Sequence, residues 1–235
     1  MQIVLVPGFW LDADSWSEVV PALEAAGHTA HPLTLPGLGS RDADRSAITF
    51  RDHVKAVIAV VDSLPDPIVL VGHSGGVAIN HAVVDARPYR IHRAICVDSW
   101  PTGEGKPIND QLPVVNGEIP LPDWSHFDDD DLVDLDDALR EEFRARAIPQ
   151  PARVATDPPH FYDERRYDVP ATVIVCEAPS SMLQEWMQPE HEYSKYLAEL
   201  AAIKDFELVD LPTGHWPQFT RPYDLAEAIL AAIDR

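Results

Sequence analysis

Basic residues are scarce in this sequence. Its 235 residues include 18 lysines and arginines against 39 aspartates and glutamates, which leaves a formal net charge of −21. Because a field of that sign repels phosphate backbones and anionic lipid, nucleic acid and membrane surfaces are poor candidate partners. We interpret the acidic surface as an aid to solubility or an adaptation to a salty cytoplasm, and we expect a small-molecule substrate and a monomer or homodimer.

Cysteines and long apolar runs are also scarce. The two cysteines, Cys96 and Cys176, each lie inside an apolar run typical of a buried strand, so we expect free thiols and not a disulfide or a metal site. The chain starts directly in the strand-like MQIVLV without a basic leader, and no apolar run approaches the ~18 residues of a transmembrane helix. These absences predict a soluble cytoplasmic protein.

Short apolar runs alternate with helical patterns along both ends of the chain, without an internal repeat. This alternation predicts an α/β fold with a parallel sheet of about six strands and helices on both faces. The expected strands are 2–6, 29–35, 68–72, 91–97, 171–176 and 206–211.

Helix start signals lie between these strands. Ser15, with Glu18 three residues later, makes a possible capping box for a first helix, in which Pro21 either kinks the helix or marks its first turn. Thr49 is the expected cap of a second helix, and Pro222 opens a closing one.

The alternation stops between Ser99 and Tyr167. This segment contains nine prolines and the acidic run DDDDLVDLDD at 128–137, and it is too long for a loop inside a compact core. We therefore predict an inserted cap at 99–167 on a core of 1–98 and 168–235. We interpret the acidic run as a solvated helix start, favoured by the helix dipole, in preference to a metal site.

The stretch 68–80, IVLVGHSGGVAIN, carries the strongest chemical motif. Gly72, Ser74 and Gly76 spell G-x-S-x-G between a buried strand and a helix, the pattern of a nucleophile elbow that holds the serine strained with its hydroxyl exposed. A serine hydroxyl is a weak nucleophile near pH 7 and needs a base. Of the ten histidines, His215 is the candidate, because it lies in the loop after the last strand.

The chain resembles α/β-hydrolases through its elbow GHSGG at 72–76, its early loop PGF at 7–9 and its late GHW at 214–216. The resemblance covers both ends of the chain but not the cap. It implies Ser74 as nucleophile, His215 as base and the backbone N–H groups of Gly75 and Phe9 as the oxyanion hole, with no cofactor or metal. Pro7 replaces a histidine that family members carry in this loop.

An aspartate is missing where the family most often places its acid, after the penultimate strand; here the chain reads IVCEAP at 174–179. Asp98 ends the strand that follows the nucleophile helix, a position used by a minority of the superfamily. Glu177 lies at the usual strand end. We predict Asp98 as the acid, with Glu177 as the alternative and a serine–histidine pair without a carboxylate as the third possibility.

Two further groups resemble parts of the chain. Cofactor-independent quinolone dioxygenases share the early loop and an acid near a tryptophan, here Asp98 and Trp100, whereas plant-type methyl esterases and hydroxynitrile lyases resemble the first hundred residues through Trp16 and LEAAGH at 23–28. We predict a serine hydrolase that cleaves a small apolar ester or related carbonyl compound. The alternatives are a lyase or oxygenase in which His215 abstracts a substrate proton, and a ligand-binding protein without catalysis.

Aromatic residues in or beside the cap suggest an apolar or aromatic substrate, although core packing explains any one of them equally well. The candidates for the substrate pocket are Trp10, Trp100, Trp124, His126, Phe127, Phe161, Trp186 and Trp216.

Overall fold

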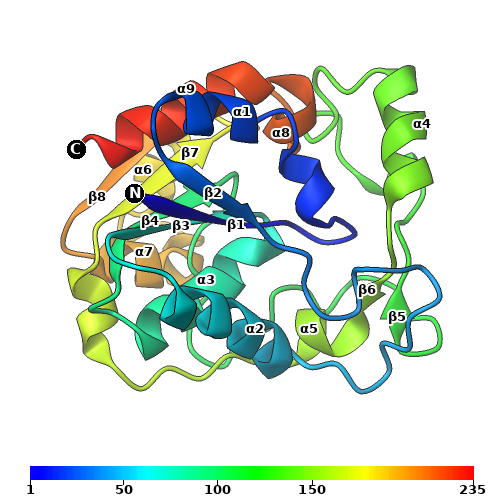
Figure 1. The fold of residues 1–235 in the computed structure, drawn as a ribbon, viewed down its shortest axis with the longest axis horizontal. Coiled ribbons are helices and arrows are strands. Elements are labelled where there is room, and N and C mark those ends of the chain that lie inside the picture. The colour runs from blue at the N-terminus through cyan, green and yellow to red at the C-terminus, as the bar shows by residue number, and fades with distance from the viewer.

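A twisted six-stranded sheet runs through the centre of the computed structural model, which describes all residues 1–235 (Figure 1). The strand order is β2-β1-β3-β4-β7-β8, and every neighbouring pair is parallel. The predicted α/β class and six-stranded parallel sheet are therefore confirmed. The strands are β1 Gln2–Val6, β2 Thr29–Pro32, β3 Ile68–His73, β4 Ile91–Val97, β7 Ala171–Val175 and β8 Phe206–Asp210.

The central strands are apolar at successive positions because both faces of the sheet are covered. In β1, Val4 and Val6 pack into one core, whereas Ile3 and Leu5 pack into a second core on the opposite face. This alternation follows from the two-residue period of a strand. Continuous burial along β1 and β3 is typical of a parallel sheet between two helical layers.

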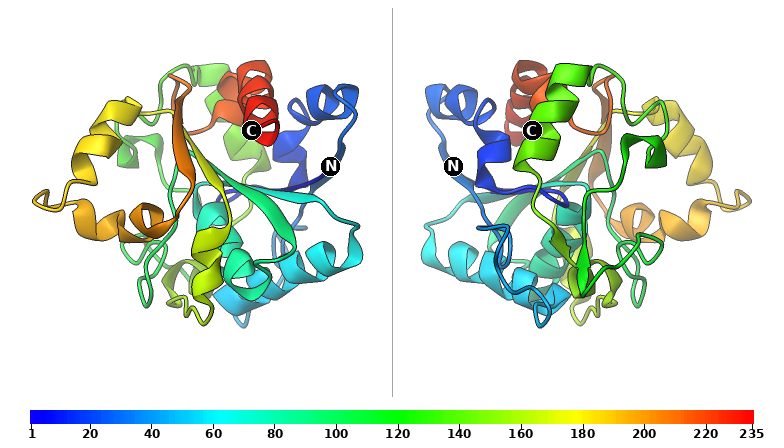
Figure 2. Two further views of the ribbon diagram at one scale, coloured as in Figure 1. Left: turned by 90° about the vertical axis from the view of Figure 1, so that its left-hand side faces the viewer. Right: turned by 90° about the vertical axis from the view of Figure 1, so that its right-hand side faces the viewer.

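Helices cover both faces of the sheet, with α2 and α3 on one side and α1 and α9 on the other (Figure 2). The predicted helix starts at Thr49 and Pro222 are confirmed: Thr49 forms a capping box with Asp52, and Pro222 opens the last helix. The helices are α1 Val20–Ala25, α2 Phe50–Ser63, α3 Gly75–Ala86, α4 Asp137–Arg146, α5 Ala152–Thr156, α6 Ser180–Trp186, α7 Ala198–Ala202, α8 Pro217–Thr220 and α9 Pro222–Ile233, with 3-10 turns η1 Ala13–Trp16, η2 Trp124–His126, η3 Glu164–Asp168 and η4 Ser194–Tyr196.

The predicted capping box at Ser15 and Glu18 is wrong. Asp12 caps the short turn η1 instead, and the Ser15 hydroxyl donates to the Asp12 carbonyl at 2.7 Å. Helix α1 starts only at Val20, with Pro21 in its first turn. Since proline lacks an N–H and its ring clashes with the carbonyl four residues earlier, one helix cannot run from Ser15 through Pro21.

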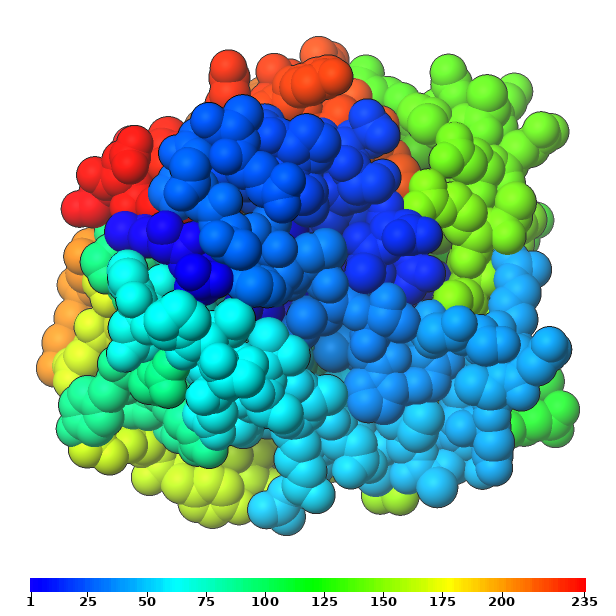
Figure 3. Space-filling model, viewed as in Figure 1, coloured from blue at the N-terminus to red at the C-terminus, as the bar shows by residue number.

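Most of the segment 99–167 lies at the carboxyl ends of the strands, whereas its last residues run back past the end of α3 to the start of β7 (Figure 1). In the space-filling view, part of this segment packs beside the N-terminal region (Figure 3). The segment contains short helices and a two-stranded antiparallel sheet of β5 Glu118–Ile119 and β6 Gln150–Pro151. The acidic run forms turns, and α4 begins only at its last residue, Asp137, with Asp136 as N-cap. The division into a core and an inserted cap stays a prediction.

Both cysteines are buried free thiols, as expected. Burial raises the pKa of the Cys96 thiol to about 12 and raises that of Cys176 as well, so both are unreactive near neutral pH. No helix has the length and apolarity needed to cross a membrane.

Candidate active site

The turn between β3 and α3 holds Ser74 in a conformation that side chains rarely adopt, with φ at 52° and ψ at −124°. The turn is tight: a Cβ on Gly76 would lie 2.6 Å from the Pro7 carbonyl oxygen, and one on Gly72 would lie 2.6 Å from Asn80 Nδ2. Only glycine fits at these two positions. The strained backbone exposes the Ser74 hydroxyl at the end of the sheet.

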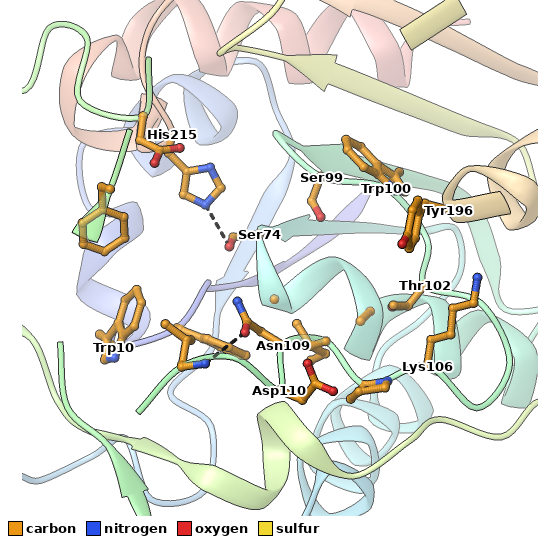
Figure 4. Close-up of a pocket in the computed structure, with 18 of the residues that line it drawn as sticks. Trp10, Ser74, Ser99, Trp100, Thr102, Lys106, Asn109, Asp110, Tyr196 and His215 are labelled. Atoms are coloured by element: carbon orange, nitrogen blue, oxygen red, sulfur yellow. Dashed lines mark hydrogen bonds between the residues drawn. The ribbon is translucent and has the colours of Figure 1, made fainter. Parts of the chain in front are cut away.

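His215, in the loop after β8, points its ring at Ser74 (Figure 4). Its Nε2 lies 2.9 Å from Ser74 Oγ, and its Nδ1 lies 2.7 Å from Asp98 Oδ2. Asp98 follows β4 with a φ of 48°, and its Oδ1 accepts hydrogen bonds from the N–H groups of Cys176 at 2.8 Å and Glu177 at 3.3 Å. The structure thus brings the predicted serine, histidine and aspartate into one chain of contacts.

Glu177 also approaches the imidazole. Its Oε1 lies 2.7 Å from His215 Nδ1, the same separation as for Asp98, but only the Asp98 contact has hydrogen-bond geometry. The two candidate acids are therefore both present at one ring nitrogen, and Asp98 is the one that accepts its proton.

Burial and mutual contact set the charges of these three groups. Burial opposes the Asp98 carboxylate, but the hydrogen bond and charge of His215, together with the contacts from Glu177 and the Cys176 N–H, outweigh it and lower the pKa of Asp98 to about 2. Burial raises the pKa of Glu177 to about 8, and His215 only partly offsets it. Burial favours neutral His215, but the contacts with both carboxyl groups raise its pKa to about 10.

His73, next to the serine, supports the backbone of His215. Its Nε2 lies 2.6 Å from the His215 carbonyl oxygen and donates to it, and its Nδ1 accepts from Gln218 Nε2 at 3.1 Å. Burial lowers the pKa of His73 to about 3, so the ring is neutral. His73 fixes the loop without touching the Ser74 hydroxyl.

The acidic run holds the same loop through its backbone. The His215 N–H donates to the Asp131 carbonyl at 2.9 Å, and the Gly214 N–H donates to the Val133 carbonyl at 3.1 Å. A Cβ on Gly214 would lie 2.4 Å from the Asp131 carbonyl oxygen. No sequence motif predicts this contact, and its only signal is the glycine beside the candidate histidine.

The loop after β1 packs directly against the elbow. Phe9 and Gly75 both line the cavity next to Ser74, and the Phe9 N–H donates no hydrogen bond within the chain. A Cβ on Gly75 would lie 2.5 Å from the Phe9 ring. Trp10 has a φ of 66°, and its indole N–H donates to the Ile119 carbonyl at 3.0 Å.

A cavity of about 650 Å³ opens above Ser74 and His215. Of the predicted pocket residues, Trp10, Trp100, His126 and Phe127 line it. Further lining residues without a sequence motif are Thr102, Lys106, Ile108, Asn109, Leu112 and Tyr196, several of which Figure 4 shows around the serine.

The other predicted aromatic residues lie outside the cavity lining. Trp216 is 2% exposed and packs edge-on against Trp124, while Trp186 packs edge-on against Trp100. Phe161 packs against His81, away from Ser74. These rings contribute to packing around the pocket and not to its wall.

The sequence profile of the Alpha/beta hydrolase family matches residues 3–228. The chain belongs to this family. Its fold agrees with that of an extracellular α/β-hydrolase from a Paenibacillus species, at a TM-score of 0.79 and 23% identity over 99% of this chain and 98% of the other. Polyneuridine aldehyde esterase superposes at a TM-score of 0.70 with 20% identity, over 100% and 99% of the two chains.

Curated relatives of this α/β hydrolase carry the name esterase. Putative methylesterase 14, chloroplastic, of Arabidopsis thaliana is 31% identical over 109 residues, which are 45% of this chain and 31% of the relative. The carbendazim hydrolyzing esterase of a Nocardioides species is 28% identical over 112 residues, 47% of this chain and 46% of the relative. The matches span less than half the length of these relatives.

One group of side chains in this α/β hydrolase has metal-ligand character. The ligand atoms of Asp98, Glu177 and His215 lie within 4.8 Å of one another. The same atoms already contact each other directly, so a cation there would have to separate His215 Nδ1 from Asp98.

Proposed function

We propose that this α/β hydrolase cleaves carboxylic esters, with Ser74 as nucleophile, His215 as base and Asp98 as the acid that orients His215. The observation that carries the proposal is the continuous contact from Ser74 Oγ through both ring nitrogens of His215 to Asp98, at 2.9 Å and 2.7 Å. The names of the curated relatives support ester hydrolysis as the reaction class.

The proton moves along this contact. Ser74 Oγ attacks the ester carbonyl while His215 Nε2 accepts the hydroxyl proton, and the N–H groups of Gly75 and Phe9 donate to the oxyanion that forms. His215 then gives the proton to the departing alcohol oxygen, leaving an acyl group on Ser74. A water molecule then loses a proton to His215 and attacks the acyl carbon, and the bond to Ser74 Oγ breaks as His215 returns that proton to the serine, which releases the acid. Asp98 holds the Nδ1–H throughout and stabilises the imidazolium.

The cavity favours an ester with an apolar or aromatic portion. Its volume of about 650 Å³ suits a small to medium-sized molecule, and Trp10, Trp100 and Phe127 provide aromatic walls. Polar groups such as Lys106 and Asn109 lie in the wall as well, so the substrate need not be wholly apolar.

A panel of esters with varied acid and alcohol parts tests the proposal. We expect turnover in the wild type, a loss of ~10³-fold or more in Ser74→Ala, and covalent labelling of Ser74 by a fluorophosphonate. Ser99→Ala is the matched control, because Ser99 lines the same cavity without bonding to His215.

Two results would contradict the proposal. A Ser74→Ala variant that keeps substantial turnover would favour proton abstraction by His215. Folded protein that neither turns over any ester nor reacts with the fluorophosphonate would favour a binding function.

A further inference from the structure

Two carboxyl groups compete for one proton in this site. His215 Nδ1 can donate a single hydrogen bond, yet Asp98 Oδ2 and Glu177 Oε1 each lie 2.7 Å from it. The donation goes to Asp98, and Glu177 Oε1 is buried without a donor of its own. A buried carboxyl oxygen that has no donor and lies 2.7 Å from an imidazole nitrogen needs an explanation beyond packing.

Backbone N–H groups donate hydrogen bonds to Asp98 but not to Glu177. Asp98 Oδ1 accepts from two backbone N–H groups, so its carboxylate is stabilised independently of His215. Glu177 has no such bonds, and the positive charge nearest its carboxyl group is a protonated His215. Within the protein, the carboxylate of Glu177 is therefore stabilised by the imidazolium and not by backbone donors.

The remaining surroundings add no compensating charge. Besides Asp98 and His215, the titratable group next to Glu177 is the buried Cys176 thiol, which stays neutral. His73, on β3 behind the loop, is also neutral. No lysine or arginine forms an ion pair with Glu177 or Asp98, so these two carboxyl groups are the charged side chains that contact the His215 ring. Asp131 lines the same cavity but forms no ion pair with His215.

We propose that Glu177 is a second positioning carboxylate, which stabilises charged His215 alongside Asp98 and thereby sets the pH at which His215 becomes a free base. The proposal rests on the function proposed above. Glu177 takes no part in the proton transfer, which runs from Ser74 Oγ to His215 Nε2 and on to the departing alcohol. Once Glu177 has lost its proton, its negative charge near Nδ1 favours both the resting imidazolium and the one formed during attack.

The order of ionisation agrees with this arrangement. Burial raises the pKa of Glu177 to about 8, and the two carboxyl groups raise that of His215 to about 10. Glu177 thus loses its proton while His215 is still an imidazolium, and the pair titrates as a coupled unit.

Glu177→Gln tests this directly, since it removes the charge and keeps the shape. We expect the acidic limb of the kcat/KM profile to move to lower pH by about one unit or more, which is the usual effect of an opposite charge at this distance. The activity at high pH should fall by no more than the factor that corresponds to that shift. Glu185→Gln, an exposed carboxyl on α6, is the control and should leave the limb in place.

An NMR titration of the His215 ring in Ser74→Ala, with and without Glu177→Gln, gives a readout that needs no turnover. The pKa of His215 should fall when the Glu177 charge is removed. If the pKa of His215 falls in this titration while the protein with Ser74 intact cleaves no ester, the proposed function fails and this inference survives. If Glu177→Gln lowers kcat or stability but moves neither titration, Glu177 only packs against the site and the inference is wrong. If the glutamine variant folds poorly, Glu177→Asp takes its place. Because it keeps a carboxyl group, its acidic limb should lie between those of the wild type and Glu177→Gln.

Discussion

Asp98 and Glu177 approach His215 Nδ1 to the same distance, 2.7 Å, from the ends of two neighbouring strands. The strands β4 and β7 are parallel partners with Val97 opposite Ile174, so the residues that follow them meet at one edge of the sheet. The two acids that the sequence left as alternatives are therefore both in the site. Hydrogen-bond geometry and backbone donors favour Asp98 as the orienting group.

Replacing the orienting acid should cost the most after Ser74 and His215. Asp98→Asn is expected to lower kcat by ~10³-fold or more, because the amide can no longer accept and stabilise the Nδ1–H of the imidazolium. Steady-state kinetics on one ester compares it with Glu177→Gln, for which we expect a much smaller loss at high pH. Near-normal activity in Asp98→Asn together with a large loss in Glu177→Gln would exchange the two roles.

The wild-type enzyme should prefer alkaline conditions. The pKa of His215 is raised from its ordinary value to about 10, and only neutral His215 can accept the Ser74 proton, so kcat/KM should increase as the pH rises past 7. Initial rates on an ester, corrected for spontaneous hydrolysis, measure this. A profile already level at pH 6 would mean that His215 titrates well below the expected range.

Local patterns predicted the elements that carry the chemistry. The G-x-S-x-G turn needs a strand before Ser74, a helix after it and glycines where a Cβ would lie only 2.6 Å from a neighbouring atom, and all of these are readable from residue types. The contacts of the His215 N–H were unreadable, because a backbone carbonyl such as that of Asp131 accepts a hydrogen bond whatever its side chain. The carboxylates of the aspartate run suggest a role for its side chains, whereas it is the main chain of this run that holds the His215 loop.

Aromatic composition did not distinguish the wall of the cavity from the packing behind it. Trp100 and Trp186 contact each other edge-on, and only Trp100 reaches the cavity. Trp216 directly follows His215 in the chain but is buried in a cluster of rings around Phe143. Which ring faces the cavity depends on the path of residues 99–167, for which the sequence carried no motif.

His73 should matter for activity more than its distance from Ser74 Oγ suggests. His73→Leu removes the donor to the His215 carbonyl and leaves that buried acceptor unpaired, at a cost of about 1–3 kcal/mol in the free energy of unfolding. The loop then shifts, and kcat/KM should fall at least ~10-fold. The control is His81→Leu, a similarly buried histidine that bonds to Glu199 and should lose stability without losing activity in the folded protein. Equal activity in the two variants would contradict the positioning role of His73.

A single added methyl group should disrupt the contact between the acidic run and the His215 loop. Gly214→Ala places a Cβ where the Asp131 and Val133 carbonyl oxygens now lie 2.4 and 2.6 Å away, so the segment must move and its hydrogen bonds to Gly214 and His215 must lengthen. We expect a loss of about 1–3 kcal/mol in the free energy of unfolding, measured by urea denaturation, and a lower kcat because Nε2 leaves its position opposite Ser74. Gly39→Ala is the matched control, since its nearest neighbour would be Thr34 Cγ2 at 3.7 Å and its backbone is not left-handed. If Gly214→Ala matches Gly39→Ala in both stability and kcat, the segment around Asp131 does not hold the histidine.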